Sequence, residues 1–380
     1  INIKLCDKYI NLFTGIIFTA NTDMKKLKPI LKIIGWLVLV VVLYLAGVII
    51  YGTITDYKRD PGAIEAAEIK GKASDSKQID SVITLISWNI GYGGLGKEMD
   101  FFYDGGKTVR APQEIWDKDF AGVQKIMSDN SDADFYLIQE IDRNSRRSYE
   151  VDMVREINHV LQGYSSSFAV NYDVKFVPVP YTNPMGKVFG GVATFSRFTP
   201  TVSERVQYPG KFPWPTRIFF LDRCYLTQRY PLSNGKELIV INTHNSAYDE
   251  TGEIKGGEMN AIKAFVEAEY KKGNYVIAGG DWNQCPPNFQ HDKFIPKSGY
   301  DGFMPPSMSF DYTPENWLWA YDPDVPTNRH LETPLDENTF RTVIDFFLIS
   351  PNIKLLKINT IDTKFEYSDH QPVKMQVELM

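Results

Sequence analysis

Short apolar runs recur from residue 82 to the end of the chain, and their composition predicts strands and helices in alternation. Six of these runs are rich in β-branched and aromatic residues, which favours strands: 82–90, 135–141, 192–195, 238–242, 275–278 and 342–349. Helical periodicity appears instead in 117–127, 149–161 and 258–270. Because the alternation continues over about 300 residues, we expect one layered α/β domain over residues 81–380.

The longest apolar run, residues 33–51, carries no charge. A helix of this length measures roughly 28 Å, close to the hydrocarbon thickness of a bilayer. The run therefore predicts a transmembrane anchor. A buried core helix is disfavoured because the run has no polar face. A cleaved signal peptide is the other alternative, but the run is long for one and no small-x-small pattern follows it cleanly.

The residues on either side of this run predict its orientation. Four lysines stand directly before it, so the positive-inside rule places residues 1–32 in the cytoplasm: Lys25, Lys26, Lys28 and Lys32. We expect a single-pass protein of the inner (cytoplasmic) membrane whose remainder lies in the periplasm or outside the cell. Met24 would make a normal start for an anchored bacterial protein, so we treat residues 1–23 as uninformative.

Residues 52–80 are polar, small and charged, with few aromatic side chains. Such a composition predicts a flexible linker, which would span roughly 30 Å between the membrane and the domain.

Composition excludes some classes of protein. With 43% hydrophobic and 13% aromatic residues, the chain is globular and not disordered. Beyond residue 56 it has 35 Lys and Arg against 44 Asp and Glu, and no dense basic run apart from 143–147, so generic nucleic-acid binding is not expected. Three cysteines, Cys6, Cys224 and Cys285, show no paired spacing and imply neither a disulfide framework nor a zinc cluster.

Polar side chains stand at the ends of the predicted strands. Asn89 precedes a glycine-rich loop, and Glu140 interrupts an apolar run that contains no lysine or arginine. A carboxylate in such a run is costly unless it is paired or metal-bound, and Mg²⁺ suits a single carboxylate with amide and water ligands. His244 ends another strand, while Asp281 and Asn283 are two apart and face the same side of an extended chain.

The end of the chain adds a carboxylate and a histidine. Asp345 is a lone acid in the apolar run 342–349, and Asp369 directly precedes His370. An imidazole that acts on protons needs a carboxylate to fix its tautomer, and the neighbouring aspartate can hold a hard metal ion through oxygen.

Taken together, residues 80–380 resemble the endonuclease/exonuclease/phosphatase superfamily, which includes pancreatic-type deoxyribonucleases and neutral sphingomyelinases. The resemblance rests on these motifs: Asn89, Gln139-Glu140, Gly190 to Arg197 as a Gly-x-Ala-x-x-Ser-Arg strand, His244, Gly280-Asp281-Trp282-Asn283, Asp345 and Ser368-Asp369-His370.

The resemblance implies a four-layer α/β/β/α sandwich of two packed mixed β-sheets and a cofactor, Mg²⁺ or Mn²⁺. In that family pattern, Glu140 assisted by Asn89 and Asp369 would hold the metal. The remaining residues would act on water and phosphate: Asp281 and Asn283 would orient the attacking water, His370 would be polarised by Asp345, and His244 would stabilise or protonate the leaving oxygen. Whether Asp281 or His370 takes the proton of water stays open.

The function implied is a phosphohydrolase, most simply a phosphodiesterase acting on a lipid headgroup, a nucleotide or nucleic acid. There are two alternatives. One is a nuclease that acts on extracellular or periplasmic DNA or RNA, and the other is a non-catalytic binding module on the same fold. Three basic residues are candidates for substrate contacts: Arg197, Lys107 and Arg110. No protein partner is implied.

Overall fold

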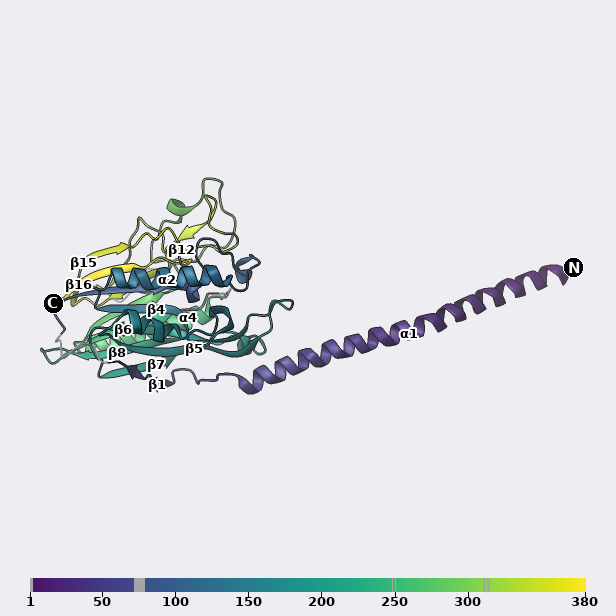
Figure 1. The fold of residues 1–380 in the computed structure, drawn as a ribbon, viewed down its shortest axis with the longest axis horizontal. Helices are drawn as coiled ribbons and strands as arrows, with labels where there is room; N and C mark the ends of the chain where they lie inside the picture. Colours follow the sequence, from purple (N-terminus) through teal and green to yellow (C-terminus); the bar gives the residue numbers. More distant parts are fainter. Residues whose placement is uncertain (1–2, 72–78, 248, 250, 310–311, 313–314) are drawn as a thin grey trace. The chain divides into compact units, whose positions relative to one another are not determined.

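The computed structural model describes residues 3–71, 79–247, 249, 251–309, 312 and 315–380, and within α1 it describes side chains from residue 27 on. The chain divides into two compact units, Ile1–Ile54 and Thr55–Met380 (Figure 1). The helices are α1 (Ile3–Thr55), α2 (Gln113–Asp129), α3 (Met153–Val160) and α4 (Glu253–Lys271).

The first unit consists of helix α1. Its segment Leu27–Thr55, which contains the predicted span 33–51, is long and apolar enough to cross a membrane. A signal sequence near an N-terminus would meet the same requirement, so sidedness and retention of the helix stay predictions.

The second unit contains two seven-stranded sheets in the part of the chain that is described. Sheet A has the order β1 (Ile64–Ala66), β7 (Val202–Gln207), β8 (Cys224–Pro231), β9 (Glu237–His244), β10 (Tyr275–Asp281), β14 (Asp345–Ile349) and β11 (Leu318–Ala320). Sheet B has the order β15 (Ile353–Thr360), β16 (Val373–Leu379), β3 (Val82–Asn89), β4 (Phe135–Asp142), β6 (Gly186–Ser196), β5 (Ser165–Val177) and β2 (Ile69–Lys70). A short ribbon pairs β12 (Asn328–Arg329) with β13 (Arg341–Thr342).

Each sheet has a parallel pair of strands at its centre, and the other pairings are antiparallel. β3 pairs parallel to β4 in sheet B, and β9 pairs parallel to β10 in sheet A. In these pairs Asn89 lies opposite Gln139, and His244 lies opposite Asp281. Parallel strands end at the same edge of a sheet, so the polar residues that end these strands are gathered there.

The two sheets pack face to face through one apolar cluster. Leu85 and Leu137 of sheet B contact Val240, Ile277 and Phe347 of sheet A within this cluster, and all five are buried. Alternating side chains that point to this face produce the apolar pattern seen in the sequence.

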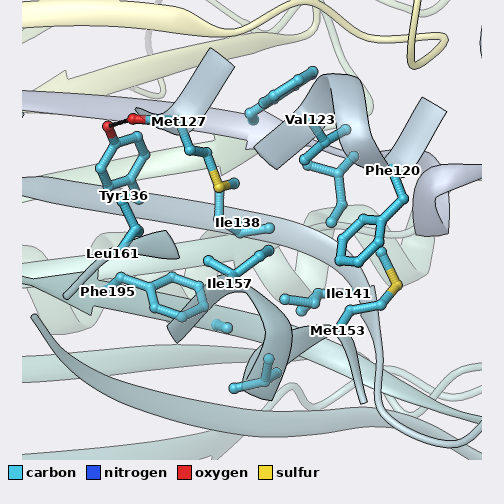
Figure 2. Packing of buried hydrophobic residues seen from close by; sticks show 14 of the residues in the cluster. Phe120, Val123, Met127, Tyr136, Ile138, Ile141, Met153, Ile157, Leu161 and Phe195 are labelled. Carbon is cyan, nitrogen blue, oxygen red and sulfur yellow. Dashed lines mark hydrogen bonds between the residues drawn. The ribbon is translucent and has the colours of Figure 1, made fainter. Parts of the chain in front are cut away.

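Helices cover the outer faces of both sheets. On sheet B, α2 presents Phe120, Val123 and Met127, which recur at helical spacing on one face, to Ile138 of β4 (Figure 2). The hydroxyl of Tyr136 donates a hydrogen bond to the carbonyl oxygen of Met127 at 2.7 Å and ties this helix to the sheet.

On the other outer face, α4 packs Met259, Ile262 and Val266 against Ile239 and Val276 of sheet A. The order of layers is therefore helix, sheet, sheet, helix, which confirms the predicted four-layer α/β/β/α sandwich with two mixed sheets.

The predicted linker 52–80 differs from the structure. Residues 64–66 pair with β7 and residues 69–70 pair with β5, so each forms a short edge strand of one sheet. The prediction of a tether is wrong for these residues, because an edge strand is held by backbone hydrogen bonds and needs few apolar side chains. Residues 72–78 lie outside the described part.

A buried ion-pair cluster attaches α4 to sheet A. Glu269 accepts hydrogen bonds from Arg229 of β8 at 2.7 Å, from Lys272 at 2.7 Å and from Asn274 at 2.8 Å. Burial by itself raises the pKa of Glu269, but these hydrogen bonds outweigh burial and lower the pKa from 4.5 to about 2. The folded state thus binds a proton at Glu269 less readily than the unfolded chain does.

We predict that Glu269→Gln lowers the free energy of unfolding at pH 7 by roughly 2 kcal/mol, because it removes a charged acceptor from three donors. The contribution of Glu269 to the free energy of unfolding is fully present above pH 4.5 and is lost as the pH falls toward 2. The free energies of unfolding of the variant and the wild type therefore become equal in acid. Urea unfolding at pH 7 and pH 3 measures this difference. Glu267→Gln on the same helix is the control, and equal losses in both variants would contradict the prediction.

Candidate active site

A cavity of about 430 Å³ opens at the edge of the sandwich where the central strands end. Its wall includes most of the residues that the sequence singles out: Glu140, His244, Asp281, Asn283, Asp369 and His370. Asn89 and Asp345 lie directly behind this wall, in hydrogen bonds with its residues.

A bulge in β4 directs Glu140 toward the cavity. The pairing of β4 with β6 shifts between Ile138 and Ile141, and Glu140 takes a left-handed backbone conformation with φ of 51°. Bulges re-aim side chains and are common next to active sites. The Glu140 carboxylate therefore leaves the apolar pattern of its strand and is 25% exposed.

The Asn89 amide connects two of the acids. Its Nδ2 donates to Oε1 of Glu140 at 3.2 Å and to Oδ2 of Asp281 at 3.0 Å, while its Oδ1 accepts from the backbone N–H of Gly91 at 3.0 Å. Gly91 has a φ of 48°, and a Cβ at this position would meet Oδ1 of Asp369 at 2.8 Å. The left-handed backbone of Gly91 and the close approach of Asp369 and Leu95 therefore favour glycine at this position.

Asp281 lies at the centre of the site. Its Oδ1 accepts from the backbone N–H of Asn283 at 2.9 Å, and its Oδ2 is 3.4 Å from Nε2 of His244. Asn283, with φ of 51°, donates from Nδ2 to the carbonyl oxygen of Asn245 at 2.8 Å. The Asp281 carboxylate is thus fixed by donors and faces the cavity.

Asp345 and His370 form a buried pair. Nδ1 of His370 donates to Oδ2 of Asp345 at 2.7 Å, and Nε2 of His370 lies 3.0 Å from Nδ2 of Asn328 and 3.8 Å from Oδ2 of Asp281. Burial raises the pKa of Asp345 to about 6, although His370 opposes this shift. Burial alone lowers the pKa of His370, but the charges of Asp345, Asp369 and Asp281 outweigh it and raise that pKa well above its usual range.

His244 is buried, and its Nε2, like that of His370, lies near Oδ2 of Asp281. Burial, reinforced by the positive charge of Arg223, lowers the pKa of His244 well below its usual range, so this imidazole is neutral at pH 7. Its Nε2 lies 3.4 Å from Asp281 and 3.9 Å from Oε1 of Glu140. One site thus holds two histidines whose charge states are pushed apart by their surroundings.

The donor set fits a divalent cation at Glu140 and Asp369. Within the described ranges, no lysine or arginine nitrogen lies within 4.0 Å of either carboxylate. Burial raises the pKa of Asp369 to about 7, with His370 opposing and the negative charge of Glu140 adding to the shift. Two nearby carboxylates without a cationic side chain are the oxygen ligands that Mg²⁺ or Mn²⁺ prefers.

A second group of three residues, Asp281, Asp345 and His370, is less suited to bind a metal ion. Ligand atoms of Asp281, Asp345 and His370 lie within 4.8 Å of one another. The 2.7 Å hydrogen bond between His370 and Asp345, however, already uses the Nδ1 atom of the imidazole. We therefore interpret this trio as a group that orients an imidazole and handles protons.

Three residues predicted to contact substrate lie away from the cavity. Arg197 follows β6, which is antiparallel to β4, so it reaches the opposite edge and donates from Nε to the hydroxyl of Tyr164 at 3.0 Å. Arg110 donates to the carbonyl oxygen of Arg146 at 3.3 Å, and Lys107 is absent from the cavity wall. The structure does not support substrate contacts for Arg197, Lys107 or Arg110, because a basic residue near a motif in sequence need not share its edge in space.

The sequence analysis does not identify several residues of the wall, among them Arg147 and Asn328. Arg147 is buried, makes a bidentate pair with Asp142 (Nε to Oδ2 2.9 Å, Nη2 to Oδ1 3.0 Å) and lies 4.0 Å from the centre of the Tyr92 ring. Its position in the basic stretch 143–147 was the only signal in the sequence. Asn328, whose Nδ2 lies 3.0 Å from Nε2 of His370, begins the two-residue strand β12, and no motif marks it in the sequence.

Two buried amides join the sheets beneath the site. Nε2 of Gln139 on β4 donates to Oδ1 of Asn242 on β9 at 2.7 Å. Nδ2 of Asn242 in turn donates to the carbonyl oxygen of Ala193 on β6 at 2.9 Å. Because Gln139 precedes Glu140 and Asn242 lies two residues before His244, this link sets how the two sheets present their site residues.

Solved structures share this architecture at low sequence identity. A 2′,3′-cyclic phosphatase, ANGEL2, is 15% identical with a TM-score of 0.51, covering 83% of this chain and 98% of its own. D. rerio TDP2 complexed with single-strand DNA product is 13% identical with a TM-score of 0.50, covering 79% of this chain and 100% of its own. An endonuclease/exonuclease/phosphatase from Bacteroides vulgatus is 15% identical with a TM-score of 0.50, covering 79% of this chain and 99% of its own. At these identities the likeness shows the fold.

The sequence has no match among curated proteins. The profile of the Endonuclease/Exonuclease/phosphatase family, however, matches residues 86–370, a range that begins within β3 and ends at His370. This range covers most of the chain and every proposed catalytic residue. The chain belongs to the endonuclease/exonuclease/phosphatase family.

Proposed function

We propose that this phosphoester hydrolase is a Mg²⁺- or Mn²⁺-dependent phosphodiesterase that attacks its substrate with an activated water molecule. The observation that carries the proposal is the connected set of contacts, from 2.7 to 3.9 Å, that joins Glu140, His244, Asp281, Asp345 and His370. These residues come from five separate stretches of the chain, and no structural role explains why they meet.

Glu140 and Asp369 are the proposed ligands of the cation, and Asn89 holds Glu140 in place while one lone pair of its Oδ1 stays available. A bound divalent cation would stabilise negative charge on the phosphate and its leaving oxygen. Glu140 needs this partner, because a partly buried carboxylate without a nearby cation is unfavourable.

Asp281 is the residue that we propose accepts the proton of water. Its two donors, Asn89 and the backbone N–H of Asn283, leave lone pairs on both oxygens that face the cavity. His370, fixed by Asp345, presents Nε2 to the same space, and with a phosphate oxygen in place of the Asn328 amide nitrogen a protonated Nε2 would donate to that oxygen. Donors that are already oriented stabilise the charge that develops on the phosphate without further reorganisation.

His244 completes the polar half of the cavity. Since its imidazole is neutral and its Nε2 lies between Glu140 and Asp281, it can donate a hydrogen bond to the leaving oxygen. The other half of the cavity is apolar and includes Phe212, Phe220 and Phe303. A diester, which carries an organic group on each side of its phosphate, fits such a wall better than a monoester does.

We also propose that residues 27–55 anchor the enzyme as a single-pass protein of the inner membrane, with the catalytic unit in the periplasm or outside the cell. The apolar length of the segment and the lysines before residue 33 support this.

We predict that His370→Asn lowers the turnover of bis(p-nitrophenyl) phosphate by roughly 10³-fold or more, because it removes an oriented donor from one cooperating unit. Steady-state kinetics with saturating Mg²⁺ measures the effect. His159→Asn, an exposed histidine on α3, is the matched control and should keep wild-type rates. A His370→Asn variant with near-normal turnover would sink the assignment.

We expect Glu140→Gln to raise the Mg²⁺ concentration for half-maximal activity by about 10-fold or more, because a ligand loses its charge. Isothermal titration of Mg²⁺ into the protein without substrate tests the same point independently of turnover. Glu150→Gln, an exposed acid beyond the same strand, is the control. An unchanged metal midpoint in the Glu140 variant would exclude Glu140 as a ligand.

For the anchor, we predict that an N-terminal tag stays covalently joined to the catalytic unit in the membrane fraction after an alkaline wash. Immunoblotting of the full chain measures the size of the tagged product. A tagged fragment of only a few kilodaltons, separate from the catalytic unit, would instead identify the helix as a cleaved signal.

For the substrate class, turnover is compared among bis(p-nitrophenyl) phosphate, sphingomyelin, phosphoinositides and plasmid DNA.

A further inference from the structure

Arg223 is a buried cation in the wall of the catalytic cavity. It directly precedes β8 and is 9% exposed. Its Nη1 is buried without a hydrogen-bond partner, and in the described residues no carboxylate oxygen lies within 4.0 Å of its guanidinium. A buried cation without a carboxylate in direct contact is unfavourable, and the charge of Arg223 reaches Glu258 only from beyond 4.0 Å, so this arrangement favours an anion bound in the cavity.

The other buried arginines of the described chain have more acceptors around them, although Nη1 of Arg205 and Nε of Arg329 also lack a hydrogen-bond partner. Arg147 pairs with Asp142, and Arg205 donates to the carbonyl oxygen of Val170 at 2.7 Å and lies 3.6 Å from a carboxylate oxygen of Glu65. Arg329 donates to five backbone carbonyls, those of Leu95, Gly96, Met99, His330 and Thr333. Arg223 differs from these three in facing the cavity without such acceptors.

A second donor without a partner lies beside Arg223. Asn171 is 2% exposed and lines the same cavity, and its Nδ2 has no hydrogen-bond partner. The pairing of β5 with β6 shifts between Val170 and Tyr172, so Asn171 sits in a bulge. The backbone N–H of Asp222 donates to the carbonyl oxygen of Asn171 at 2.8 Å, which places Asn171 next to the residue that precedes Arg223.

These two donors adjoin the catalytic residues. β8 is antiparallel to β9 with Tyr225 opposite Thr243, so Arg223 reaches the edge at which β9 ends in His244. The charge of Arg223 is the largest influence on the pKa of His244 after burial, which agrees with a short separation. A ligand in the cavity can therefore contact His244 and Arg223 together.

We propose that Arg223 and Asn171 form a subsite for a second phosphate of the substrate, beside the phosphate ester that is hydrolysed. A guanidinium offers parallel N–H donors that match two phosphate oxygens, and the amide of Asn171 adds a third donor. The preferred substrate is then a phosphodiester that carries a further phosphate. The place of this group in a substrate rests on the proposed function, whereas the binding of an anion at Arg223 does not.

Thermal unfolding in EDTA tests the subsite without turnover, with inorganic phosphate titrated against sodium chloride of equal ionic strength. We expect phosphate to raise the Tm of the wild type and of Arg155→Met, an exposed arginine on α3, by the same few degrees. Arg223→Met should lose this rise, and its Tm without phosphate should equal or exceed that of the wild type, because an uncompensated buried charge has been removed.

No phosphate-dependent rise in the wild type, an equal rise in Arg223→Met, or a lower Tm of that variant without phosphate would overturn the proposal. If Arg223→Met does not fold, Arg223→Lys decides, since it keeps the charge without the bidentate geometry. We expect it to need at least about fivefold more phosphate for the half-maximal shift. An unchanged midpoint in Arg223→Lys would count against the subsite.

Kinetics with a matched pair of substrates separates this proposal from the proposed function. Thymidine 5′-(p-nitrophenyl phosphate) is compared with the same ester carrying a 3′-phosphate. We expect the wild type to prefer the second compound by about tenfold or more in kcat/KM, and Arg223→Met to lose the preference. Equal cleavage of both by the wild type overturns the subsite but not the hydrolase. Cleavage of neither, with the phosphate shift intact, overturns the hydrolase but not the anion site.

Discussion

The buried hydrogen bond between Gln139 and Asn242 is the contact on which the geometry of the site depends. Each amide would be an unsatisfied polar group in an apolar interface, at a cost of roughly 1–3 kcal/mol, if the two sheets slid past one another. Sliding would break this 2.7 Å bond and the bonds from Asn242 to the carbonyl oxygens of Ile138 and Ala193, so these contacts favour one alignment of the sheets. That alignment places Glu140 of one sheet 3.9 Å from the imidazole of His244 in the other.

Backbone irregularity then turns the site residues away from the regular pattern of their strands. Bulges in β4 and β5, on either side of β6, carry Glu140 and Asn171. Both bulges face a pair of glycines in β6. A Cβ at Gly190 would meet Oδ1 of Asp142 at 2.2 Å, and a Cβ at Gly191 would meet the carbonyl oxygen of Ala169 at 2.0 Å. The glycines of β6 thus leave room for the two bulged strands beside it. A side chain at either glycine would collide with β4 or β5.

The fold and the residues at the strand ends were predictable, whereas the wall of the cavity was not. Asp281 and Asp345 interrupt or end apolar runs, and burial of such polar groups requires a partner or a function, so their pattern is informative. Arg223 and Asn171 also lie among apolar residues, but neither belongs to a motif of the family, and local sequence does not show that both side chains line the cavity. Arg197 was misassigned because a motif fixes a strand but not which end of that strand reaches the cavity.

The place of β16 in sheet B bears on how the protein is made. This strand, the last of the described chain to leave the ribosome, pairs with β3, whose residue Ser87 lies opposite Val373. Until β16 emerges, a nascent chain exposes the open backbone edge of β3. The catalytic unit therefore completes its folding only after residues 373–379 have been synthesised, which favours chaperone protection of the nascent chain during this interval.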